Sequence, residues 1–377
     1  MSENNTLEAL DLNKSIVNYR RPDMSFCFID KNRMPISTFR NLGNTCFLNS
    51  ILQALFYTSP LRKFILEGNY PMNEETDRLW VEYVQLTKLM CQSNYRITPN
   101  GFFTQIYFAK QKHDHRQEDA HEWLHFLLDH FHEVLREKGR KFRDLTSAMV
   151  DDKKLLIKQS MDELNRTTDY SIIQKMFMTQ FHQRTQCTKC STTSHRYPIE
   201  HEIVLSMDNN TSYSNIFHLL SDNCGRKTLK DDDAYHCEKC CEKCNGSGAE
   251  KCTKTEALQK TTYFRLPKQM IIVFGRFKST WNGNGMQYTK NSKLIDFPIN
   301  DLDMTKFCSY PDSSKIMYDL YAVCNHQGST PDSGHYYTTA KAGNKWVVLN
   351  DEKVSYVNNI ENIVGAEAYI TFWRRRS

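Results

Sequence analysis

The chain has 377 residues, of which 40% are hydrophobic and 12% aromatic, and this composition excludes a largely disordered protein. Its 49 basic and 44 acidic residues give a net charge of +5, which is too balanced and dispersed to indicate nucleic-acid binding. The longest strongly apolar run, 270–274, is far shorter than the roughly 18 residues of a membrane span, and the N-terminus lacks the pattern of a secretory signal. We therefore expect no membrane association.

The 13 cysteines are an odd number in a chain for which we expect no export. This argues against a disulfide framework and favours metal ligands or a reactive thiol in a reducing compartment. The sequence thus predicts an intracellular protein, cytoplasmic, nuclear or both.

Helical periodicity dominates the first part of the chain. Residues 1–35 are polar and have no sustained period, so we interpret them as an N-terminal extension to a single folded domain, 36–377. Apolar stripes at helical spacing predict helices over 47–56, 79–90 and 120–135. The charged stretch 151–166 is either an exposed helix or a linker.

Strands are predicted in the second part, where β-branched and aromatic runs alternate with polar turns. The predicted strands are 262–266, 270–274, 318–324, 336–340 and 345–349. The Gly- and Asn-rich stretch 279–292 is predicted to be a loop. Helices followed by strands indicate an α+β protein.

Cys46 is a candidate nucleophile because it follows a turn and opens the first predicted helix, with Asn44 or Thr45 as the N-cap. The positive end of a helix favours thiolate over thiol, which makes the sulfur reactive. Gly43 permits a tight path into the cap. Asn41 could place its amide near the sulfur, where an oxyanion forms during attack on a carbonyl. Position alone does not exclude a buried structural cysteine at 46.

The segment 41–55, NLGNTCFLNSILQAL, resembles the cysteine box of the ubiquitin-specific proteases, which are papain-like deubiquitinases. That family also has a Gln-x-Asp-Ala-x-Glu segment, two Cys-x-x-Cys knuckles and a histidine box, and this sequence has all three in the same order. The resemblance extends from Ile36 to Trp373. It implies a papain-like cysteine protease fold with a helical thumb (36–145), zinc-bearing β fingers (180–270) and a β-rich palm in the remainder of the domain.

The resemblance implies a thiol isopeptidase that hydrolyses the bond after the C-terminal glycine of ubiquitin through an acyl-enzyme on Cys46. In this family the Ser-Gly-His-Tyr pattern identifies His335 as the general base and acid. Ubiquitin and ubiquitinated proteins are the implied partners, and an activating protein partner is a further expectation. The alternative is a catalytically silent, zinc-stabilised ubiquitin-binding scaffold of the same fold.

A third group should orient the imidazole, and Asn350 and Asp351 are the candidates. If 343–344 is a two-residue turn, strand alternation puts Asn350 on the same face as His335 and turns Asp351 away. A three-residue turn would instead put Asp351 opposite His335. The family spacing after Trp346 favours Asn350, with Asp351 as the second choice.

Substrate recognition is implied for the segment 117–122. By resemblance, Asp119 binds an arginine of the Leu-Arg-Gly-Gly tail of ubiquitin, and Gln117 and the backbone near Gly334 help to hold this tail. A carboxylate at position 119 also has a purely structural explanation, because acidic groups stabilise helix N-termini.

Two Cys-x-x-Cys pairs supply the four thiolates of a structural Zn²⁺ site. They are Cys187, Cys190, Cys237 and Cys240. The long separation between the pairs weakens the bare motif but is typical of the fingers of the family. Cys241, Cys244 and Cys252 offer an overlapping knuckle, so the register stays open and a second metal site is conceivable.

Overall fold

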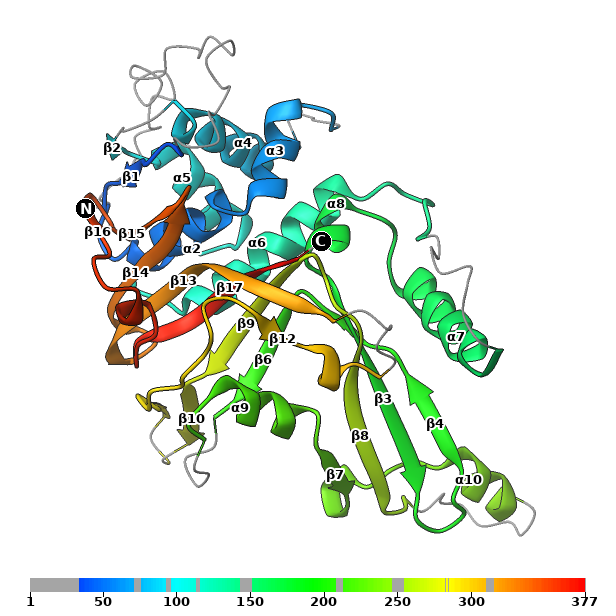
Figure 1. Cartoon of the computed structure of the whole chain (residues 1–377). Coiled ribbons are helices and arrows are strands. Elements are labelled where there is room, and N and C mark those ends of the chain that lie inside the picture. The colour runs from blue at the N-terminus through cyan, green and yellow to red at the C-terminus, as the bar shows by residue number, and fades with distance from the viewer. Residues whose placement is uncertain are drawn as a thin grey trace, which may run out of the picture.

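The computed structural model describes residues 34–70, 76–92, 96–112, 116–142, 151–207, 213–245, 254–281, 283, 285–309 and 315–376. The predicted extension 1–35 therefore lies almost entirely outside the described residues. Helices dominate the part before residue 180 and strands the part after it, which confirms the α+β class (Figure 1). None of the described helices is long and apolar enough to cross a bilayer.

The N-terminal helices form one end of the molecule, the thumb (Figure 1). They are α2 (Cys46–Phe56), α3 (Ser59–Glu67), α4 (Arg78–Met90), α5 (Asn100–Ala109) and α6 (Ala120–Leu135). All eleven residues of α2 are buried, because this helix lies between the other helices and the main sheet. Pro60 lies in the first turn of α3, where its missing N–H has no cost.

The main sheet, the palm, has the strand order β16-β15-β14-β13-β17-β9-β6, with β12 paired to β13. Its strands are β6 (Glu202–Ser206), β9 (Gln269–Gly275), β12 (Leu302–Asp303), β13 (Met317–Thr330), β14 (Ser333–Ala342), β15 (Lys345–Asn350), β16 (Lys353–Tyr356) and β17 (Ala368–Arg375). One apolar cluster fills the space between the thumb helices and this sheet, and a second covers the opposite face of the sheet.

A smaller sheet, the fingers, extends away from the palm (Figure 1). Its strand order is β4-β3-β8-β7, with β5 paired to β3. Its strands are β3 (Thr179–Cys187), β4 (Thr193–Arg196), β5 (Ile199–Glu200), β7 (Arg226–Leu229) and β8 (Ala257–Arg265), and the helix α10 (Glu238–Asn245) lies at its far end. The predicted boundaries of thumb, palm and fingers stay predictions.

One prediction about the remaining elements is wrong. The stretch 279–292 was predicted to be a loop, but most of it belongs to a hairpin of β10 (Phe277–Trp281) and β11 (Met286–Lys290). The Gly and Asn residues of this stretch are concentrated between the two strands, and the residues on either side of them pair as antiparallel strands. The charged stretch 151–166 is the helix α7 (Asp151–Thr167). The other elements are α8 (Ile172–Phe177), α9 (Ile216–Asn223), β1 (Thr38–Phe39) and β2 (Arg96–Ile97).

Candidate active site

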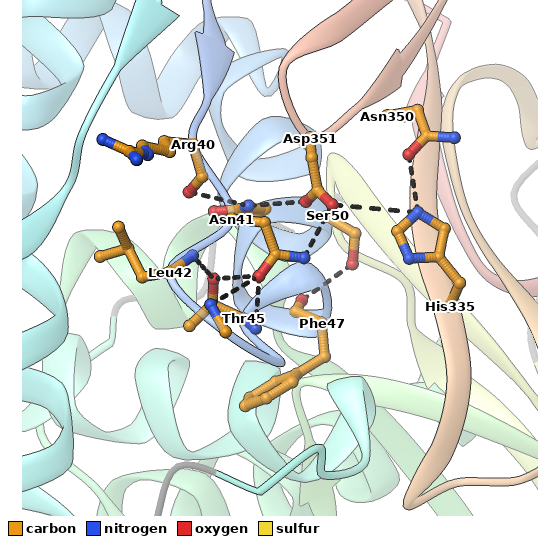
Figure 2. Close-up of polar contacts among 11 residues, drawn as sticks. Arg40, Asn41, Leu42, Thr45, Phe47, Ser50, His335, Asn350 and Asp351 are labelled. Carbon is orange, nitrogen blue, oxygen red and sulfur yellow. Dashed lines mark hydrogen bonds and ion pairs between the residues drawn. The ribbon is translucent and has the colours of Figure 1, made fainter.

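Cys46 is the first residue of α2, and Thr45 is the N-cap. The preceding turn needs two positive φ angles, 98° at Gly43 and 57° at Asn44. Asn41 stabilises this turn, because its Oδ1 accepts hydrogen bonds from Gly43 N at 3.0 Å and from Thr45 N at 3.2 Å (Figure 2). The turn thus holds the buried Cys46 at the positive end of a fully buried helix.

His335 lies near the start of β14, the strand that packs beside α2. A hydrogen bond with the Cys46 side chain raises the pKa of His335 to about 9, and the bond to Asn350 acts in the same direction against the effect of burial. The Nε2 atom of His335 lies 2.6 Å from Asn350 Oδ1 (Figure 2). Nδ1 is therefore the ring nitrogen left to face the thiol.

The position of Asn350 follows from the hairpin register. Ala342 pairs with Lys345, so 343–344 is the two-residue turn of the first alternative, with φ of 65° at Gly343. The geometry places Asn350 at the imidazole, and its catalytic role stays a prediction.

The expectation that Asp351 faces away from the imidazole is wrong. Its Oδ2 lies 4.0 Å from His335 Nε2 and accepts a hydrogen bond from Asn41 Nδ2 at 2.9 Å (Figure 2). Strand alternation does not apply to Asp351, because it follows the last residue of β15 and has φ of 49°. The left-handed turn brings its side chain back toward α2.

Asn49 is a residue that the sequence analysis missed. It is buried on α2, and its Nδ2 donates to Asp351 Oδ1 at 2.7 Å. Asn41 and Asn49 therefore hold both oxygens of the Asp351 carboxylate. The available signal was a polar residue on the buried face of a helix, where burial costs free energy unless a partner is present.

Gly334 is required by the protein's own backbone. Its φ is 125°, and a Cβ atom there would lie 2.1 Å from Gln327 O and 2.9 Å from His326 Nε2. The register between β13 and β14 is irregular at this point, between Gln327 and Thr330. The glycine lets the chain pass this bulge immediately before His335.

Asp119 is the N-cap of α6 and accepts from His121 N at 2.8 Å. The Tyr369 hydroxyl also lies 2.7 and 2.8 Å from its two oxygens. Burial raises the pKa of Asp119, and these two hydrogen bonds oppose that effect. The structural explanation for a carboxylate at this position therefore holds, and a role in recognition stays a prediction. Gln117 lies nearby in the chain and has a buried Nε2 atom without a hydrogen-bond partner among the described residues.

The four predicted cysteine ligands meet at the end of the fingers. The sulfur atoms of Cys187, Cys190, Cys237 and Cys240 all lie within 4.8 Å of one another. The Sγ–Sγ distances are 3.9 Å for Cys187–Cys240 and 3.5 Å for Cys190–Cys237. Tetrahedral zinc with Zn–S bonds of about 2.3 Å requires sulfur separations of about 3.8 Å, so the cluster fits a zinc ion.

Among the described residues, the second Cys-x-x-Cys pair of the cluster is Cys237 and Cys240. Cys241 is not one of the four clustered cysteines, and its sulfur lies 3.4 Å from His236 Nε2. The side chain of Cys244 and the whole of Cys252 lie outside the described residues. A second metal site therefore stays a prediction.

A zinc ion held by this cluster is expected to stabilise the fingers, so its removal should destabilise them. We expect a zinc-specific chelator to release one zinc per chain and to lower the melting temperature, because zinc bound at 1,000 times its Kd contributes about 4 kcal/mol. Metal analysis and calorimetry check this, and Cys190→Ser should reproduce the effect. Cys308→Ser, which alters a cysteine outside the cluster, is the control. An unchanged melting temperature after complete zinc release would contradict a structural role.

The chain is similar to known proteins over most of its length. The family model of the ubiquitin carboxyl-terminal hydrolases matches residues 38–373. The chain is 27% identical over 355 residues to ubiquitin carboxyl-terminal hydrolase Usp2 of Drosophila melanogaster, covering 92% of this chain and 35% of Usp2. It is 28% identical to ubiquitin carboxyl-terminal hydrolase 17-like protein A of Mus musculus, covering 89% of this chain and 56% of that protein. The chain thus spans between one third and somewhat over half of these relatives.

Solved structures share the fold. The SAGA Ubp8/Sgf11/Sus1/Sgf73 DUB module bound to ubiquitin aldehyde matches with a TM-score of 0.67 and 20% identity, over 92% of this chain and 71% of that chain. A yeast SAGA DUB module with an Sgf73 mutant also matches with a TM-score of 0.67, at 21% identity, over 92% of this chain and 70% of that one. These matches confirm the predicted fold. Because the family model covers nearly the whole described chain, the chain belongs to the ubiquitin carboxyl-terminal hydrolases and is a ubiquitin-specific protease by family.

Proposed function

We propose that this chain is a cysteine deubiquitinase that hydrolyses the isopeptide bond between the C-terminal glycine of ubiquitin and a lysine amine. The observation that carries the proposal is the arrangement of Cys46 at a helix N-terminus beside a histidine that is hydrogen-bonded to Asn350. A reactive thiol, a base and an orienting group at hydrogen-bond distances form the pattern of nucleophilic catalysis. The proposed partners are accordingly ubiquitin and ubiquitinated proteins.

The reaction would proceed in two steps. His335 takes the thiol proton of Cys46, the sulfur attacks the carbonyl carbon of the terminal glycine, and the protonated His335 gives that proton to the lysine amine as the C–N bond breaks. The resulting thioester then reacts with water. His335 takes a proton from that water as the water oxygen bonds to the carbonyl carbon, and the C–S bond breaks. This restores the Cys46 sulfur beside the protonated His335, and ubiquitin leaves with its terminal carboxyl group, which loses its proton to solvent.

Oxyanion stabilisation is proposed for Asn41 and the start of α2. The N–H groups of the first helical turn have no acceptor within the helix, so that of Cys46 is available at the place where negative charge develops. One Asn41 amide hydrogen is directed to Asp351, and the second is the one we assign to the oxyanion. In this arrangement Asp351 fixes the amide, while Asn350 fixes the imidazole.

The orienting role of Asn350 has a measurable consequence. Asn350→Ala should lower kcat by roughly tenfold, less than loss of His335 does, because an unoriented imidazole still reaches the productive rotamer part of the time. Steady-state kinetics with a fluorogenic ubiquitin substrate measure this loss. The comparison variant is Asp351→Asn, which keeps one acceptor for Asn41 and Asn49. An unchanged kcat in Asn350→Ala would contradict the orienting role of Asn350.

Recognition of the basic ubiquitin tail is proposed for Asp119 and Gln117, with the backbone at Gly334. The Asp119 carboxylate has lone pairs beyond those used by His121 N and Tyr369, and the buried Gln117 Nε2 has no hydrogen-bond partner among the residues that the structure describes. A tail that ends in two glycines suits a narrow approach to a buried thiol.

Asp119→Asn tests the proposed recognition, because this change keeps an acceptor for the helix cap but removes the charge. We expect KM for ubiquitin conjugates to rise roughly tenfold with kcat nearly unchanged, since a hydrogen bond to a charged group contributes about 1.5–3 kcal/mol. Glu133→Gln, in the last turn of the same helix, is the matched control. An unchanged KM in Asp119→Asn would contradict the role in recognition.

Incubation with ubiquitin–lysine conjugates distinguishes the proposed enzyme from the silent scaffold. The silent scaffold of the same fold would bind ubiquitin without releasing product over hours. An activating protein partner stays an expectation, because the similarity to the Ubp8 module is one of fold. Turnover by the isolated chain would show that no such partner is required.

A further inference from the structure

We propose that Lys290 is a positioning residue for the catalytic histidine, and that it acts by fixing the tautomer of the buried His326. The inference rests on the proposed function and deepens it. Lys290 is the last residue of β11, and its Nζ lies 3.0 Å from His326 Nδ1 and donates to His326 O at 2.5 Å. The hairpin β10–β11 thereby reaches β13, the strand beside the one that carries His335.

The Lys290 ammonium determines which His326 nitrogen carries the proton. An ammonium group has three donors and no acceptor, so Nδ1 beside it must accept. His326 is completely buried, and burial together with the neighbouring Lys290 charge lowers its pKa to about 4. The ring is therefore neutral at pH 7, with its proton on Nε2.

Within the described part of the chain, the hydrogen bond of the His326 Nε2 proton leads to the backbone. His326 Nε2 lies 3.3 Å from Ser333 O, so the neutral ring donates to the backbone two residues before His335. The intervening residue is Gly334, and the absence of a side chain there leaves room for the same imidazole, because a Cβ atom would lie 2.9 Å from His326 Nε2. The chain of contacts thus runs from Lys290 through His326 to the bulge that sets the direction of His335.

The hairpin is built to hold Lys290 in this position. Phe277, its cross-strand partner, packs edge-on against His326 with ring centroids 5.2 Å apart. The Tyr336 ring also packs against His326, with ring centroids 4.5 Å apart. Burial, together with the charge of Arg276, lowers the pKa of Lys290 to about 8, and the charge of Glu367 opposes this effect. Lys290 is thus protonated at pH 7.

The test uses Lys290→Met, which keeps the chain length and removes the donors, with Lys278→Met as the control on the exposed face of the same hairpin. We expect kcat to fall about tenfold with KM changed less than about twofold, because a misplaced imidazole affects chemistry and not ubiquitin contact. Lys290→Arg should keep most of the wild-type activity, because arginine also has a positive charge and hydrogen-bond donors. Lys278→Met should behave as the wild type.

Two readouts separate positioning from loss of fold and from failure of the proposed function, because neither requires turnover. Alkylation of Cys46 by iodoacetamide at about pH 6 should slow in Lys290→Met, since the imidazole that supports the thiolate is displaced. Nitrogen-15 NMR of histidine-labelled wild-type protein should show His326 with an acceptor-type Nδ1 and a protonated Nε2, and Lys290→Met should change this pattern. His326→Gln assigns the signals.

The possible outcomes are distinct. Wild-type kcat and alkylation in a folded Lys290→Met would overturn the proposal, as would a protonated Nδ1 on His326 in the wild type. If Lys290→Met fails to fold, Lys290→Arg and the wild-type NMR signals still decide between the two tautomers. If the wild type does not hydrolyse ubiquitin conjugates, the proposed function fails, while the alkylation and NMR results still test the contact chain.

Discussion

Cys46→Ala is expected to abolish hydrolysis of ubiquitin conjugates, with kcat reduced on the order of 10⁴-fold or more. The change removes the nucleophile, and no other thiol among the described residues has a hydrogen bond to His335. Ubiquitin binding should stay near its original strength, because the buried sulfur supplies chemistry and little contact area. Single-turnover kinetics and titration calorimetry measure the two quantities separately.

The matched control for this variant is Cys91→Ala. Cys91 is another buried cysteine of the thumb, directly after α4, and it lies outside the proposed site. Its removal should cost some stability but leave kcat within about twofold of the wild type. Full activity in Cys46→Ala would end the assignment of the nucleophile.

His335→Ala should be nearly as damaging as Cys46→Ala, because the two residues act as one unit. Their losses should not add: the double variant should be no slower than Cys46→Ala alone. Measured kcat values of the two single variants and the double variant check this. Additive losses in the double variant would mean that Cys46 and His335 act independently.

The pH dependence gives a second readout of His335. Its pKa is raised from about 6.5 to about 9 by the bond with Cys46, so the protonated imidazole persists through neutral pH. The leaving amine needs this proton, so kcat/KM should fall as pH rises through about 9. A raised pKa stabilises the fold below about pH 6.5, and this contribution is lost as pH rises through about 9. The melting temperatures of wild type and His335→Ala should therefore converge above pH 9.

Sequence reasoning could predict those parts of the site that depend on local chemistry. Cys46 at a helix start follows from a turn signal and an apolar stripe, and Asn350 follows from the hairpin turn at 343–344. The four cysteine ligands follow from two local knuckles, although strand pairing between β3 and β8 was needed to bring the knuckles together.

The features that sequence reasoning missed depend on tertiary contacts. Asp351 departs from strand alternation because it lies in a turn with a positive φ, which a periodicity argument cannot include. Tyr369 reaches Asp119 from 250 residues away in the chain. The β10–β11 hairpin has a turn rich in Gly and Asn, and composition alone cannot distinguish such a hairpin from a loop.

The most direct test of the proposed function is reaction with ubiquitin that carries a thiol-reactive electrophile at its C-terminus, followed by mass mapping of the adduct. We predict one ubiquitin per chain, attached to the peptide that contains Cys46, and no adduct in Cys46→Ala. Attachment to another cysteine, such as Cys324, or ubiquitin binding without any adduct would contradict a deubiquitinase that acts through Cys46.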